Sequence, residues 1–143
     1  MELKFLMFFT VLFLGFFNVA KADSPLTSTD IASAYANENI IKTAGNSGGL
    51  LTEELMKYLN NKSNPISLKL AVINKLSWDI DGKKNADTFW KYLKKNNKFK
   101  SMEDFQKKGS AEQLICYAYL KALDNYFDVD AALEMALVAR KKD

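Results

Sequence analysis

The sequence predicts an all-α fold, a compact bundle of six or seven short helices built from antiparallel helical hairpins. Apolar residues recur with the 3.6-residue period of a helix along most of the chain, and no stretch alternates apolar and polar residues as a strand does. One stretch, 110–127, is apolar around most of its circumference, so other helices must pack on several of its sides. We therefore expect it to be the central helix.

The first 22 residues have the pattern of a signal peptide. Lys4 precedes an apolar run from Phe5 to Phe17, and Ala20-Lys21-Ala22 matches the small-residue motif of a cleavage site. The run is short for a membrane span and no second run follows it, so no transmembrane helix is expected in the mature chain. We expect a periplasmic or secreted protein, cleaved near Ala22. Retention of the segment as an uncleaved anchor is the alternative.

Residues 23–143 are predicted to form a single all-helical domain, which their number permits. Residues 23–28 form a polar leader, expected to be loose. A first helix is expected from Ser28 or Thr29 to about Thr43, and the glycine-rich segment 45–49 ends it.

Two further helices are expected before residue 82. Residues 51–60 have inward-facing positions at Leu55 and Leu59. Asn64 is a good N-cap and Pro65 suits a first turn, so the next helix is expected to begin there and run to about Ile80. Its apolar face carries Ile66, Leu70, Ile73 and Ile80.

The C-terminal half is predicted to add three or four helices. Residues 85–96 have the anchors Phe89, Trp90 and Leu93, and the basic connector 98–109 has room for a short helix at 101–107. The central helix begins at Ser110-x-x-Gln113, a capping box. Asp128 or Asp130 caps a last helix to about Lys141, whose basic end complements the helix dipole.

A faint internal repeat relates 53–59 to 87–93, which lie 34 residues apart and resemble each other position by position. The helices that follow them, around 70–76 and 117–123, also share apolar spacing. Two stacked αα hairpins, as in HEAT-like arrays, would produce this pattern. Chance similarity is the alternative, because the helical period by itself forces such matches.

Catalytic residue types are scarce. The chain contains no histidine, which removes the commonest general base and metal ligand. Its single cysteine, Cys116, lies among apolar neighbours and is expected to be a small buried hydrophobe. The glycines of 45–49 are not followed by the Gly-Lys-Ser/Thr of a phosphate loop, and no cofactor is predicted.

Carboxylate pairs leave one enzymatic alternative open, a small hydrolase that acts on an envelope polymer. The pairs are Glu53 with Glu54, Asp79 with Asp81, and Asp128 with Asp130. Helix capping explains the aspartates equally well.

A calcium loop is a second alternative reading of one segment. Ser77, Asp79 and Asp81 alternate before Gly82, as in the first half of such a loop. Thr88 stands where the closing bidentate Glu belongs, so a polar turn without metal is predicted.

A basic segment, Lys83 to Lys108, contains nine lysines and three acidic residues. Such a segment suits anionic lipid headgroups or an acidic polysaccharide. The chain has one arginine, the residue that grips phosphate bidentately, so a merely solvated face is the alternative.

We therefore predict a non-enzymatic binding module whose partner is another protein, with no role in nucleic-acid binding. Aromatic side chains with a polar tip are common in binding hot spots, and they mark the candidate surface together with nearby lysines. The candidate residues are Trp78, Trp90, Lys91, Tyr92, Lys94, Lys95, Tyr117 and Lys121. The hydrolase and the anionic-surface binder remain the alternatives.

Overall fold

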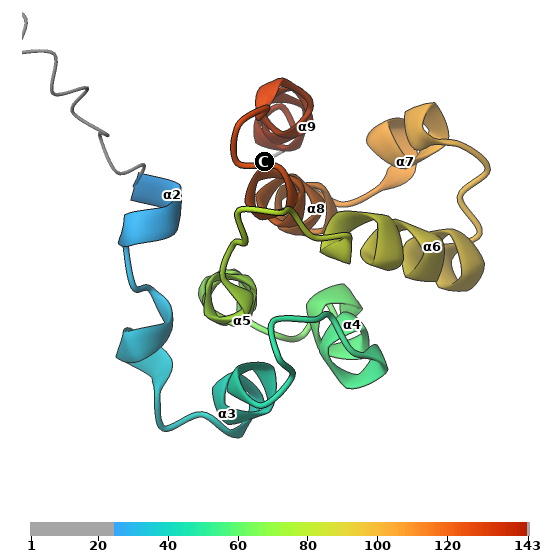
Figure 1. Cartoon of the computed structure of the whole chain (residues 1–143). Coiled ribbons are helices and arrows are strands. Elements are labelled where there is room, and N and C mark those ends of the chain that lie inside the picture. Colours follow the sequence, from blue (N-terminus) through green and yellow to red (C-terminus); the bar gives the residue numbers. More distant parts are fainter. Residues whose placement is uncertain (1–24, 143) are drawn as a thin grey trace, which may run out of the picture.

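A computed structural model describes residues 25–142, and every regular element in that range is a helix (Figure 1). The predicted all-α class is confirmed. The signal-peptide prediction for 1–22 lies outside the described residues. In chain order the elements are α2 (Pro25–Ser28), the 3₁₀ helix η1 (Ala32–Tyr35), α3 (Asn39–Gly45), α4 (Glu53–Asn60), α5 (Ile66–Leu76), α6 (Asn85–Asn97), α7 (Met102–Lys108), α8 (Ala111–Asp124) and α9 (Asp130–Arg140).

The central position of α8 is confirmed. It contacts α2, α4, α5, α6 and α9, which surround it in Figure 1. The capping box is also present: the Gln113 N–H donates to Ser110 Oγ (3.2 Å), and the Ser110 N–H donates to Gln113 Oε1 (2.9 Å). The apolar residues that α8 buries are Leu114, Cys116, Ala118, Leu120, Ala122 and Leu123.

Two helices end earlier than predicted. α5 ends at Leu76 instead of about residue 80, and α8 ends at Asp124 instead of residue 127. Ile80 and Phe127, expected on apolar faces, are therefore 71% and 75% exposed. The boundaries predicted from the sequence were wrong here. Apolar residues continue at helical spacing beyond Leu76 and Asp124, but hydrogen bonds from outside each helix to its last carbonyl end it there.

Lys83 is the residue that binds both ends. Its ammonium donates to the carbonyls of Leu76 (2.6 Å) and Ser77 (3.1 Å), and its N–H donates to the carbonyl of Asp124 (3.1 Å). Orphan carbonyls at a helix C-terminus need such partners. Gly82, at φ +77°, permits the approach, since a Cβ there would lie 2.9 Å from the Asp124 carbonyl oxygen.

Asp124 also caps a helix that is remote in the sequence. One oxygen of its carboxylate accepts from the N–H of Ala86 in the first turn of α6 (2.7 Å). The neighbouring Asn85 accepts from the Leu51 N–H (2.8 Å) and donates to the Gly49 carbonyl (2.9 Å). The start of α6 is thus held by α8 and by the segment before α4.

The N-terminal part differs from expectation in two ways. Residues 23–28 were expected to form a loose leader. The part of it that the structure describes, Pro25–Ser28, forms the single-turn helix α2. The continuous helix expected up to Thr43 is instead divided into η1 and α3, because Glu38 is extended (ψ 132°) between them. Asn64 was expected to cap α5, but its side chain donates to the Tyr58 carbonyl instead (2.9 Å).

Within the described range, no helix is both long enough and apolar enough to span a bilayer.

Candidate functional site

An apolar groove lies between α2, α5, α8 and α9, with a volume of about 450 Å³. Its lining residues are Leu26, Ile31, Leu70, Ile115, Ala118, Tyr119, Ala122, Val129, Ala132, Leu133 and Ala136. This lining contains no carboxylate, so the groove lacks the pair of acids that glycoside hydrolysis needs. What the groove offers is hydrocarbon surface, which suits an apolar partner.

One edge of the groove is an exposed stripe on α9. Val129, Leu133 and Leu137 are spaced four residues apart, which places them on the same side of a helix. They are 37%, 57% and 44% exposed, whereas Met135 of the same helix is 4% exposed and packs into the core. Contiguous exposed apolar surface of this kind is typical of interaction sites.

The opposite wall, α2, is positioned by two polar side chains. The Tyr119 hydroxyl donates to the Leu26 carbonyl (3.2 Å), and the Asn74 amide donates to the Tyr119 oxygen (3.0 Å) and to the Thr29 carbonyl (2.9 Å). Asn74 Oδ1 accepts from the Ala32 N–H (3.1 Å). Burial raises the pKa of Tyr119, so its hydroxyl keeps the proton that it donates.

The lysines predicted for binding divide into two groups. Lys91, Lys94 and Lys95 are exposed on α6, whereas Lys121 is half-buried on α8. Lys83 serves the helix ends, and Lys108 forms an ion pair with Asp104 (2.6 Å).

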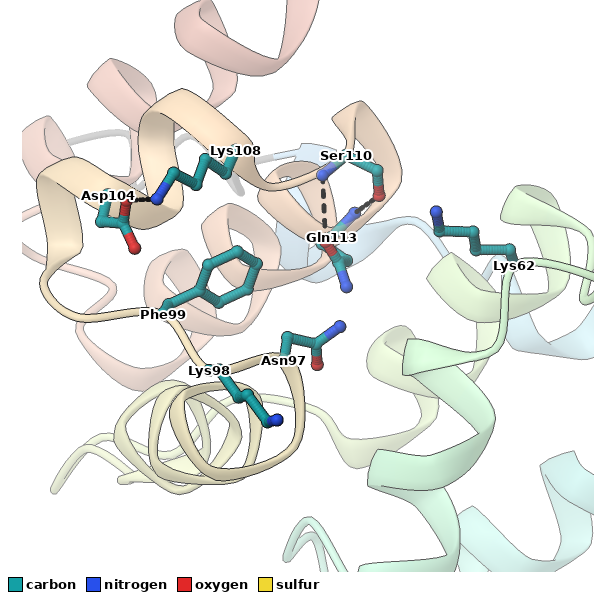
Figure 2. A pocket seen from close by; sticks show the side chains of 8 residues that line it. All are labelled: Lys62, Asn97, Lys98, Phe99, Asp104, Lys108, Ser110 and Gln113. Carbon is teal, nitrogen blue, oxygen red and sulfur yellow. Dashed lines mark hydrogen bonds and ion pairs between the residues drawn. The ribbon is translucent and has the colours of Figure 1, made fainter.

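A polar pocket of about 410 Å³ lies beyond the C-terminal end of α6, and Figure 2 shows its lining. The capping box of α8 forms one wall, and Lys98 follows α6 with the positive φ of a left-handed cap (59°). Asp104 compensates Lys108, which leaves Lys62 and Lys98 as uncompensated charges of this pocket. The pocket therefore extends the positive charge of α6.

The predicted aromatic surface is largely used in packing. Trp90 stacks on Phe105 with ring centroids 5.6 Å apart, and Tyr117 meets the same ring edge-on at 5.9 Å. Tyr117 is 7% exposed, because α8 places this position against Phe105 of α7 rather than toward solvent. Its contact with a partner stays a prediction. Trp78 packs on Tyr126 with ring centroids 5.2 Å apart, and Tyr92 is half-buried.

The segment considered as a calcium loop is organised by hydrogen bonds. Asp79 Oδ1 accepts from the Asp81 N–H (3.0 Å), and the Ser77 carbonyl accepts from the Lys83 ammonium. Among the described residues, no three acidic, cysteine or histidine side chains gather in a way that could hold a metal ion.

Cys116 is fully buried, and burial raises the pKa of its thiol to about 12. A thiol of this pKa is almost entirely protonated at neutral pH and is a poor nucleophile. Its surroundings include Lys69, 1% exposed, whose ammonium pairs with Glu112. This pair joins α5 to α8.

The groove was missed by reasoning from the sequence. The signal for it exists in 129–137, where apolar residues occupy two sides of one helix and a neighbour can cover only one of them. Comparison with protein-family models, curated proteins and solved structures found no match to this chain.

Proposed function

We propose that the protein is a non-enzymatic binding module that holds an amphipathic helix of another protein in the groove between α2, α5, α8 and α9. The observation that carries this proposal is the apolar lining of the groove together with its exposed edge on α9. The signal-peptide pattern of residues 1–22 supports a place of action outside the cytoplasm.

The shape of the exposed surface favours a helix over a small apolar molecule. Val129, the N-cap residue of α9, together with Leu133 and Leu137 extends over about 12 Å, at a rise of about 1.5 Å per residue. Leu137 lies outside the groove lining, so the apolar surface continues past the cavity. A helix docked along α9 would cover this length with anchors at i, i+3 or i+4 and i+7.

Charge next to the stripe indicates what flanks the partner's anchors. Asp130 and Glu134 are exposed and lie within about 100° of Leu133 around α9, on the side away from Ala132 and the groove. Arg140 is also exposed and lies in line with the stripe at its C-terminal end, so acidic charge flanks only the first part of the stripe. A partner helix with basic residues beside that part would complement it. We therefore expect a basic amphipathic helix.

The scaffold is further proposed to consist of two related hairpins, α4–α5 and α6 with α8. Fully buried residues at matched positions support this: Leu55 corresponds to Phe89, and Leu59 to Leu93. Ala71, Ile73 and Leu76 of α5 are buried like Ala118, Leu120 and Leu123 of α8. Stacked helical hairpins commonly serve as binding scaffolds.

Site-specific photocrosslinking tests the proposal. The full chain, produced in its own host so that any processing takes place, carries a benzophenone amino acid at position 137. The expected product is a crosslink to one protein, at a peptide that forms a basic amphipathic helix. Leu133→Glu should abolish the crosslink, because it buries a charge in the interface. Ala131→Glu is the matched control, since Ala131 is exposed on the opposite side of α9.

Two outcomes would overturn the proposal. Equal crosslinking in the Leu133→Glu and Ala131→Glu variants would show that the groove is not the binding surface. A crosslink to a second copy of this chain, with a dimer in light scattering that Leu133→Glu dissociates, would make the groove a self-association surface.

A further inference from the structure

The lysines of α6 occupy one side of the helix. At 100° per residue, Lys91, Lys94 and Lys95 of α6 fall within a sector of about 100°, and the flanking residues Lys84 and Lys98 stand at the two ends of the helix. All five are exposed. The opposite side carries the buried residues that anchor α6 to the core. We call these five lysines the α6 lysine row, and it extends over about 21 Å at a rise of about 1.5 Å per residue.

Two acidic residues lie near the α6 lysine row: Asp87 is exposed on the same side of α6, and the charge of Lys95 helps to lower the pKa of Glu53. The positive charge of the row still exceeds theirs within the described part of the chain. The ion pairs found there involve Lys57, Lys69 and Lys108, so no carboxylate oxygen lies within 4.0 Å of the ammonium groups of the row. Spacings of three and four residues within the row bring like charges together and disfavour the free helix. An anion that neutralises the row removes this repulsion.

The composition and shape of the row indicate the class of anion. The row contains no arginine, the residue suited to gripping a fixed phosphate or sulfate with two hydrogen bonds. The row follows a single helix, and its ammonium groups act as point charges. Half-buried Trp90 and Tyr92 lie about 100° on either side of Lys91, and such rings are enriched at the headgroup level of membranes.

We propose that the α6 lysine row docks the protein onto a membrane surface rich in anionic phospholipid. In this arrangement α6 lies parallel to the surface, and Lys62 of the adjoining pocket adds to the contact. Figure 1 shows α6 and α2 on opposite sides of α8, so the apolar groove faces away from this contact. The docking is therefore independent of what the groove binds.

Sedimentation with vesicles tests the proposal. The chain, produced in its own host so that any processing takes place, is mixed with vesicles of phosphatidylcholine, either pure or with about 30% phosphatidylglycerol, at about 0.1 M and about 1 M NaCl. We expect cosedimentation with the anionic vesicles that is lost at high salt. The K91A/K94A/K95A variant should bind about 100-fold more weakly, since each lysine contributes on the order of 1 kcal/mol near an anionic surface.

The matched control removes three exposed lysines from other elements, K42A/K75A/K141A, so that the net charge changes equally. Circular dichroism melting verifies that both variants fold. Equal losses in the two variants would overturn the proposal, because they would reflect net charge alone. Equal binding to neutral and anionic vesicles would also overturn it. Release of the protein from anionic vesicles by a soluble acidic polysaccharide, added at a matched concentration of charge, would overturn it as well.

Discussion

Lys83 and Asp124 are 41 positions apart in the chain, and the Lys83 N–H donates to the Asp124 carbonyl at 3.1 Å. Through its ammonium Lys83 also binds the last carbonyl of α5, and through its carboxylate Asp124 caps α6. These two residues therefore fix where α5 and α8 end and where α6 begins. The candidate sites on α6 and α8 depend on this junction.

Replacing Lys83 with Met should destabilise the fold by about 1–3 kcal/mol, because it leaves the Leu76 carbonyl without its donor while preserving the aliphatic stem. Urea unfolding monitored by tryptophan fluorescence gives the free energy. Lys84→Met is the control, since Lys84 is exposed. Equal stability of the two variants would contradict the capping role of Lys83.

Replacing Ser77 with Gly should stabilise the protein by about 1 kcal/mol. Ser77 has φ 60° and ψ 177°, a backbone conformation that is accessible to glycine and strained for other residues. Ser77→Ala keeps the strain and should change the free energy of unfolding by less than about 0.5 kcal/mol. A lower melting temperature for Ser77→Gly than for the wild type would refute the strain.

The local part of the fold was predictable from the sequence. The capping box at Ser110 and Gln113 involves residues three apart, and the burial of Leu114, Leu120 and Leu123 follows from the helical period. The helix ends at Leu76 and Asp124 were not predictable, because a residue distant in the sequence or outside the helix binds them.

The candidate groove shows the same limit. Leu133 and Met135 are both apolar residues of α9, yet Met135 is 4% exposed and Leu133 is 57% exposed. The sequence gives the periodicity of each helix but not which side a neighbour covers. Tyr117 was a candidate residue for a binding surface, whereas packing on Phe105 buries it.

Asp124 should make stability depend on pH in an unusual direction. Burial raises the pKa of its carboxyl above the ordinary 3.8, against the smaller opposing effects of the Ala86 and Asn85 amides. Its stabilising contribution is therefore fully present below the unfolded pKa and is lost as pH rises through the raised folded pKa. The free energy of unfolding of the wild type, minus that of Asp124→Asn, should fall as the pH rises above the ordinary carboxyl pKa of 3.8.

This subtraction removes the contributions of carboxylates such as Asp104, whose pKa the Lys108 ammonium lowers and whose contribution has the opposite sign. Urea unfolding at several pH values supplies both free energies. A difference that rises with pH would mean that the amide hydrogen bonds outweigh burial at Asp124.

Replacing Tyr119 with Phe should loosen α2 more than the rest of the fold. The variant loses the hydrogen bond to the Leu26 carbonyl and leaves the Asn74 amide with one acceptor fewer. Hydrogen exchange of residues 26–32 should accelerate by about tenfold, which corresponds to about 1.4 kcal/mol. Tyr58→Phe is the control, and unchanged exchange at 26–32 in Tyr119→Phe would show that other contacts hold α2.

Lys69 and Glu112 should respond asymmetrically to mutation. Lys69 is 1% exposed and pairs with Glu112, whose side chain is 38% exposed. Glu112→Ala strands a buried ammonium and should cost about 3 kcal/mol, the low end of the range for buried pairs because water reaches Glu112. Lys69→Met should be neutral or stabilising, since a hydrocarbon chain of similar length fills the same space.

The double variant should recover most of the stability lost in Glu112→Ala, and urea unfolding of the wild type and the three variants measures the coupling between the two residues. If Lys69→Met proves as destabilising as Glu112→Ala, the ion pair itself, rather than the avoidance of a stranded charge, stabilises the contact between α5 and α8.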